Sequence, residues 1–237
     1  MLDIKEERKY RRLRELSQKL HIPTFEAFLT LEVFDKDGKL IQQHRQRSHS
    51  WTRNAYNFLF SSLAAKNADD NTFGAGKLSI KDTGAVVQYS EKPIANRYDQ
   101  DHDTALFYGY IAPASDDDYG ILVGYGPAAE SFEDYVLENP IIEGTTDDGH
   151  HLSFAEGEAH AISYAGLVLT DTLVRYFNNN EATNSVDINE VALCLSSYVK
   201  GDNYKWLNSR DHLASTVTVP PTGQLKVTYT IQLTYPA

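Results

Sequence analysis

A glycine-rich motif after the apolar stretch 121–123 raises the possibility of nucleotide chemistry. Gly124-Tyr-Gly126-Pro-Ala-Ala129 has the spacing G-x-G-x-x-A of dinucleotide-binding turns. That chemistry needs a full βαβ crossover behind the turn, whereas Asn139-Pro140 ends this segment early. Three acids also stand near where a pyrophosphate would bind: Glu130, Glu133 and Asp134. We therefore expect a turn between strands and predict no cofactor.

Acidic loops and histidines are the candidate metal ligands. Asp99, Asp101 and Asp103 have the first spacing of a calcium loop, but Thr104 and Tyr110 stand where an EF-hand needs Gly and Glu. We therefore predict no EF-hand. The other candidates are the acidic run 116–118, the acidic turn 147–149, and the histidines His150, His151 and His160. Solvated loops are the favoured interpretation of each, with incidental metal binding as the alternative.

The residues that could act as nucleophiles form no recognisable catalytic motif. The single cysteine, Cys194, lies in the apolar run 191–195, which favours a buried thiol and excludes an internal disulfide. No nucleophile elbow, zincin helix or phosphate loop is present. We predict that the protein is not an enzyme. A hydrolase with paired carboxylates stays an alternative, because such a pair has no fixed spacing in sequence.

The elements that must position these residues are mainly strands. From Gln224 to Tyr235 apolar and polar residues alternate without a break, which predicts a long strand with one buried face after a turn at Pro220-Pro221. A hairpin is expected where residues 25–33 alternate before the turn Lys36-Asp37-Gly38-Lys39. A helix is predicted near 51–65, with Ser50 as its N-cap.

Short apolar runs separated by turn residues continue along the rest of the chain and favour an all-β architecture. We predict a mainly β protein, an antiparallel, jelly-roll-like β-sandwich with one inserted helix. The predicted division is a basic helical arm over residues 1–23 and a sandwich domain over residues 24–237. No stretch approaches twenty apolar residues and the N-terminus does not resemble a secretory signal, so we expect no membrane association.

The N-terminal arm differs from the rest of the chain in charge. Residues 1–20 contain seven Lys/Arg and four Asp/Glu and are therefore +3, which leaves −14 on the remainder of a chain whose net charge is −11. Three leucines spaced along one helical stripe accompany the basic residues. The stripe either packs on its own domain or docks on another protein; the acidic body opposes nucleic-acid binding. The predicted docking residues are Arg8, Arg11, Arg12, Leu13, Leu16 and Leu20.

Aromatic residues suggest a second kind of surface. The chain has 15 tyrosines and 10 phenylalanines, and rings of the 66–119 loops or around Tyr204-Lys-Trp206 could act as stacking platforms for a sugar. Tyr204 and Trp206 are therefore candidate ligand-binding residues. A receptor- or carbohydrate-binding module is the alternative function.

The order of several segments resembles a recurring kind of tailed-bacteriophage virion protein. These segments are Ser48-His-Ser-Trp-Thr-Arg-Asn54, Gly120-Ile-Leu-Val-Gly-Tyr-Gly126, Asp134-Tyr-Val-Leu137, Pro140-Ile-Ile-Glu-Gly144, Phe177-Asn-Asn-Asn180, Val186-Asp-Ile-Asn-Glu-Val-Ala-Leu193, Ser209-Arg-Asp-His-Leu213 and the stretch 217–231. The resemblance spans roughly residues 40–235 as a loose pattern. It implies a β-sandwich structural protein of the virion, assembled in the host cytoplasm as a capsid- or tail-associated accessory. The implied partners are other virion proteins, with homo-oligomerisation expected. Under the same resemblance, the alternative binding module would belong to a tail fibre or baseplate.

Overall fold

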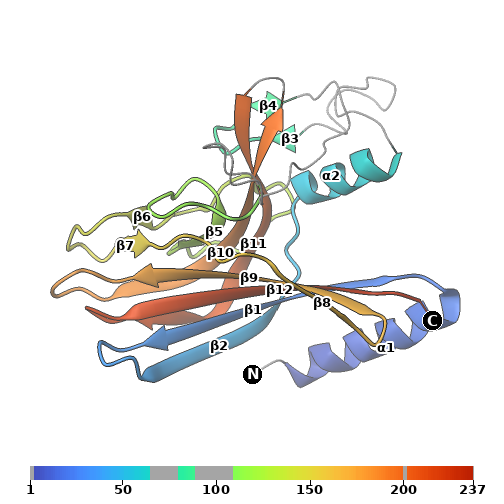
Figure 1. Ribbon diagram of the computed structural model, residues 1–237, viewed down its shortest axis with the longest axis horizontal. Helices are drawn as coiled ribbons and strands as arrows, with labels where there is room; N and C mark the ends of the chain where they lie inside the picture. The colour runs from blue at the N-terminus through green and yellow to red at the C-terminus, as the bar shows by residue number, and fades with distance from the viewer. Residues whose placement is uncertain (1–2, 65–79, 89–108, 200–201, 237) are drawn as a thin grey trace.

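The computed structural model describes residues 3–64, 80–88, 109–199 and 202–236, and within them the chain is mainly β (Figure 1). The large sheet has seven strands in the order β2-β1-β12-β9-β7-β6, with β8 also paired to β9; the second sheet has the order β11-β10-β5, and β3 pairs with β4. The helices are α1 (Ile4–Leu20) and α2 (Arg53–Ala64). The strands are β1 (Thr24–Phe34), β2 (Leu40–Ser48), β3 (Ile80–Lys81), β4 (Val87–Gln88), β5 (Gly120–Gly124), β6 (Ile142–Glu143), β7 (His151–Phe154), β8 (Ala161–Ala165), β9 (Val168–Asn178), β10 (Val186–Val199), β11 (Asp202–Val219) and β12 (Gln224–Thr234).

The centre of the large sheet is the alternating C-terminal strand. β12 lies between β1 and β9, antiparallel to both, with Leu29 and Leu173 on either side of Tyr229. Because directly paired residues share a face, the alternating side chains of all three strands form one apolar layer. The predictions of a mainly β chain and of the strand at 224–235 are confirmed.

A single main core lies between the large sheet and the three-stranded sheet. Its fully buried members include Leu31 and Val227 from the large sheet, and Val123, Val191 and Val217 from the smaller one. Strands β10 and β11 extend beyond the part of the second sheet that covers this core. Figure 1 shows their paired ends continuing toward β3, β4 and α2. This arrangement of two sheets around one core is consistent with a β-sandwich.

The predicted internal helix is present as α2, but its capping differs from the expectation. The helix begins at Arg53, and the Thr52 hydroxyl before it donates to the carbonyl oxygen of Leu207 at 2.7 Å. Ser50 does not cap it; its hydroxyl instead donates to Glu130 at 2.7 Å. Helix α2 packs on the second sheet, where Phe58 meets Trp206 edge-to-face. No helix in the described parts of the chain is long and apolar enough to cross a membrane.

Candidate functional site

Helix α1 lies on the outer face of the large sheet and is held there by a cluster of charged side chains. Arg47 of β2 is buried and donates to both Glu26 of β1 and Glu7 of α1. Arg14 of α1 donates to both carboxylate oxygens of Glu26, at 2.7 and 2.8 Å. Glu26 is itself only 6% exposed. The Glu26 carboxylate is thus shared by Arg14 of the helix and the buried Arg47 of the sheet, and these charge-assisted hydrogen bonds fix the helix in position.

Further polar contacts complete this docking of α1. The Arg47 guanidinium lies 3.8 Å from the centroid of the Tyr10 ring, and the Ser17 and Thr24 hydroxyls are hydrogen-bonded at 2.7 Å. Burial is the largest influence on Tyr10 and raises its pKa, although Arg47 acts in the opposite direction. The side of α1 that faces its own sheet is therefore polar and charged.

The three leucines of α1 do not take part in this contact. Leu13, Leu16 and Leu20 are 48%, 46% and 65% exposed. At about 100° of rotation per residue, this leucine stripe lies roughly 100° around the helix axis from the residues that face the sheet. The alternative in which the leucines pack on their own domain is therefore wrong. The predicted docking residues Arg8, Arg11 and Arg12 are also exposed. By helical spacing, however, Arg8 and Arg11 lie farther around the helix from the leucines than Arg12 does.

An aromatic groove of about 640 Å³ opens beside the start of α2. Its lining is Trp51, Tyr56 and Phe132, together with the polar residues His49, Ser50, Glu130 and Ser131. The Tyr56 and Phe132 rings are about half exposed, and their centroids are 5.8 Å apart. The Trp51 ring is held in place by two edge-to-face contacts. Its centroid lies 5.1 Å from that of Phe25 and 6.4 Å from that of Tyr229.

Glu130 places a carboxylate in the wall of this aromatic groove. Partial burial is the largest influence on its pKa and raises it, but the hydrogen bond from Ser50, a backbone hydrogen bond, and the charges of His49 and His212 outweigh burial and hold the pKa below its ordinary value. Glu130 is therefore ionised at neutral pH. The groove combines flat apolar rings with one anionic acceptor, which suits a hydroxylated or cationic ligand.

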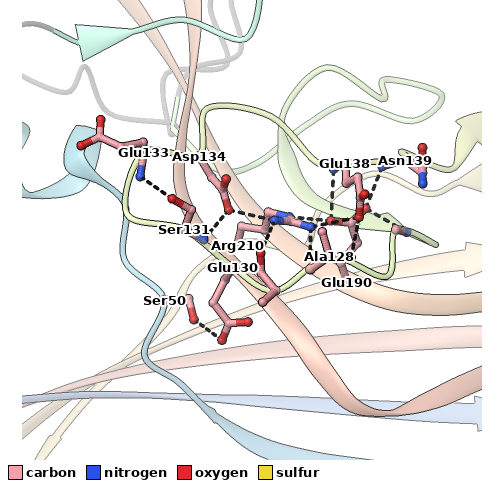
Figure 2. A network of polar contacts seen from close by, with 12 residues as sticks. Ser50, Ala128, Glu130, Ser131, Glu133, Asp134, Glu138, Asn139, Glu190 and Arg210 are labelled. Atoms are coloured by element: carbon pink, nitrogen blue, oxygen red, sulfur yellow. Dashed lines mark hydrogen bonds and ion pairs between the residues drawn. The ribbon is translucent and has the colours of Figure 1, made fainter.

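The loop that carries Glu130 and Phe132 is held by a buried ion network (Figure 2). Glu190 is fully buried and accepts from the Arg210 Nε at 2.6 Å. Glu190 also accepts from three backbone N–H groups, of Gly126, Glu138 and Asn139. Arg210 in turn donates to Asp134 at 2.8 Å and to the carbonyl oxygens of Ala128 and Ala129. One buried pair thus fixes both ends of the loop that forms the groove wall.

This network also settles the glycine motif as a turn. A Cβ on Gly126 would lie 2.6 Å from Glu190 Oε1 and from Glu138 Oε2. A carboxylate therefore occupies the space beside the glycine, where a bound phosphate would be repelled. No helix follows the turn before β6, so the βαβ context of a dinucleotide site is missing.

The candidate platform at Tyr204 and Trp206 needs correction. Trp206 is 1% exposed and packs with Phe58, Ile80 and Leu195 in a separate small core. Tyr204 is half-buried and lies against Trp206, with ring centroids 5.5 Å apart. Because the Trp206 ring has no open face, it cannot stack on a ligand in this structure. Two aromatic residues that do line a groove, Trp51 and Phe132, were not predicted from the sequence as ligand-binding residues. Phe132 reaches the groove only because of the way its loop folds, and the sequence carries no local pattern for that.

The candidate metal ligands have separate partners. The Nδ1 atom of His151 lies 2.8 Å from Asp148 Oδ1, and that of His160 lies 2.7 Å from Asp171 Oδ2. The His150 ring stacks on Tyr125, with ring centroids 4.2 Å apart. Among the residues that the structure describes, no group of three or more His, Cys, Asp or Glu side chains is placed to hold a metal ion. Asp99, Asp101 and Asp103 lie outside the described residues.

Cys194 lies on β10, the central strand of the second sheet, and is fully buried against Ala112 and Tyr119. Desolvation by burial is the main influence on the thiol and raises its pKa well above the ordinary value. Because the thiolate is the reactive form, this cysteine is inert at neutral pH, and its predicted burial is confirmed.

Comparison of the chain with protein-family models, with curated proteins and with solved structures finds no match.

Proposed function

We propose that this protein is a non-enzymatic structural component of a bacteriophage virion, a jelly-roll-like sandwich that joins the capsid or tail as a decoration, neck or fibre-anchoring accessory. The observation that carries the proposal is the exposed leucine stripe of α1. The loose resemblance of residues 40–235 to virion proteins supplies the class of assembly, and the stripe supplies a means of docking.

The energetics of α1 support an assembly role for the stripe. The helix is fastened to its own sheet by the Arg47, Glu26 and Arg14 cluster, so the leucines are not needed to hold it in place. Fully burying one leucine contributes about 1.5–3 kcal/mol. A fixed helix with three half-exposed leucines in a row therefore offers a rigid apolar surface, which is a typical mark of protein interaction sites.

The test replaces the stripe without altering the attachment of α1. In Leu13→Ser/Leu16→Ser/Leu20→Ser, we expect a folded protein whose copy number in purified particles falls at least about tenfold, the loss that 1.4 kcal/mol of docking free energy produces. The matched control is Glu15→Ser/Gln18→Ser, at exposed positions of the same helix. Normal incorporation of the stripe variant would sink the proposal.

A receptor- or carbohydrate-binding module is the second candidate, and the aromatic groove favours it. The rings of Tyr56 and Phe132 can stack on a sugar while the Glu130 carboxylate accepts hydrogen bonds from its hydroxyl groups. We expect saturable binding of a glycan on an array, lost in Tyr56→Ala and in Phe132→Ala and kept in Leu63→Ala on the exposed side of α2. If the array shows no binding, or if the two groove variants bind like wild type, this candidate is excluded.

A further inference from the structure

Within the residues that the structure describes, one end of the large sheet presents a largely exposed apolar face. Phe25, Leu233, Leu169 and Tyr164 are paired across β1, β12, β9 and β8 and so share the face that forms the core elsewhere in the sheet. Figure 1 shows β8 and the adjoining part of β9 extending past the three-stranded sheet that covers that core. At this end Phe25, Ile162, Tyr164 and Tyr235 are 49%, 67%, 60% and 39% exposed, and we call these four residues the bare sheet face.

Strand β8 is an edge strand that buries little against its own domain. All five residues of β8 are exposed, and within the described residues β8 pairs only with β9. Its regular contact with the rest of the sheet is the backbone pairing to β9, which in turn pairs with β12. Yet Ile162 and Tyr164 continue the apolar alternation of the core, and Tyr164 meets Tyr235 edge-to-face at 6.0 Å. An ordered strand whose apolar face stays exposed is typical of a surface that a partner covers in the assembled state.

We propose that the bare sheet face is covered by the leucine stripe of α1 from a second copy of this chain. This inference rests on the proposed function, in which the stripe is the assembly surface, and it names the partner. Both surfaces are apolar, and their borders have opposite charge. By helical spacing Lys9 continues the line of the stripe toward the N-terminus, and Lys5 and Arg12 lie along one side of it. On the sheet, Asp171, which contacts His160, lies directly opposite Ile162, and the exposed Glu156 and Glu158 precede β8.

A copy cannot cover its own bare sheet face. Helix α1 is fastened to the outer face of the sheet through Arg47, and only residues 21–23 connect it to β1. The bare sheet face belongs to the opposite, core-forming face. A contact between two different surfaces is heterologous, so each copy uses its stripe on one neighbour and its sheet face on another. The predicted product is a closed ring or a filament.

The test uses two variants that each lose one surface. The stripe variant is Leu13→Ser/Leu16→Ser/Leu20→Ser, the sheet variant is Ile162→Ser/Tyr164→Ser, and the control is Ile41→Ser on the exposed part of β2. By light scattering over a range of concentrations, we expect wild type and control to associate beyond the dimer and each variant alone to be monomeric. An equimolar mixture of the two variants should form a one-to-one dimer and stop there, because only one intact pair of surfaces remains.

Other outcomes overturn the inference in distinguishable ways. If the stripe variant still dimerises while the sheet variant does not, the sheet faces pair with one another instead. If wild type is monomeric at all concentrations, self-association is excluded; loss of particle incorporation by the stripe variant would then still uphold the proposed function. Circular dichroism of each variant establishes that it is folded.

A second measurement does not depend on loss of binding. In a mixture of Leu16→Cys and Tyr164→Cys chains, oxidation should yield a disulfide-linked heterodimer as the main product. The buried Cys194 does not compete. Leu16→Cys mixed with Ile41→Cys is the control. Equal cross-linking in the two mixtures would contradict the proposed contact.

Discussion

At the scale of single residues, Arg175 of β9 ties several neighbouring segments to the large sheet. It is 1% exposed, and its guanidinium donates to five backbone carbonyls, those of Ala155, Tyr119, Ile121, Pro113 and Asp116. Burial is the main cause that lowers the pKa of Arg175 to about 10, so it is charged at neutral pH. One side chain thus attaches the 113–121 segment, which has little regular structure before β5, to the large sheet.

Arg175→Leu should be strongly destabilising. The change leaves several buried carbonyl oxygens without a donor, and each such group costs about 1–3 kcal/mol. We expect a loss of at least about 3 kcal/mol in the free energy of unfolding, measured by urea denaturation. Arg175→Lys restores one donor group and should recover only part of the loss. A cost below 1 kcal/mol for Arg175→Leu would show that water or relaxation satisfies these carbonyls.

The buried carboxyl group of Asp211 predicts an unusual pH dependence of the free energy of unfolding. Desolvation raises its pKa, outweighing hydrogen bonds from Ser48, Ser209 and Tyr229. Between the ordinary carboxyl pKa and the raised value the folded state binds more protons than the unfolded state, so this residue makes unfolding easier as pH rises through that interval. Asp211→Asn removes the titration. We expect the free energy of unfolding of Asp211→Asn, relative to that of wild type, to increase as pH is raised above about 4. Urea denaturation at several pH values measures this difference. A difference that does not vary with pH would refute the assignment.

At the scale of elements, the attachment of α1 depends on one carboxylate. Glu26→Gln removes the charge shared by Arg47 and Arg14 and leaves a buried arginine underpaired, at a cost of about 3–5 kcal/mol for a fully broken pair. We expect faster hydrogen exchange of the α1 amides, with exchange in β12 unchanged. Arg11→Gln, on an exposed part of the helix, should leave both unchanged. Equal protection of α1 in Glu26→Gln and wild type would mean that other contacts suffice.

The same helix shows which features could be predicted from sequence. Alternation in β12 and helical spacing in α1 are local patterns, and they identified both elements and the leucine stripe. The contact that holds α1 is not local: Glu26 and Arg47 meet only because β1 and β2 pair with Ala27 opposite Ser48. Trp206 was misplaced for a similar reason, because its burial depends on α2 packing across β11. The Glu26–Arg47 contact and the burial of Trp206 both depend on strand register and on packing between distant segments. Neither register nor long-range packing produces a periodic pattern in the sequence.

At the scale of the whole molecule, the basic arm and acidic body predict how salt acts on assembly. If Lys5 and Lys9 border a docked stripe, Lys5→Glu/Lys9→Glu should weaken association at low salt, because these charges then face Asp171 and its acidic neighbours. Arg8→Glu/Arg11→Glu changes the net charge equally but alters positions farther from the stripe around the helix, so its effect should be smaller. At 1 M salt, where the screening length is about 3 Å, both variants should approach wild type, as measured by light scattering. If the two double variants weaken association equally, general repulsion between acidic bodies governs assembly, and the charges beside the stripe make no specific contact.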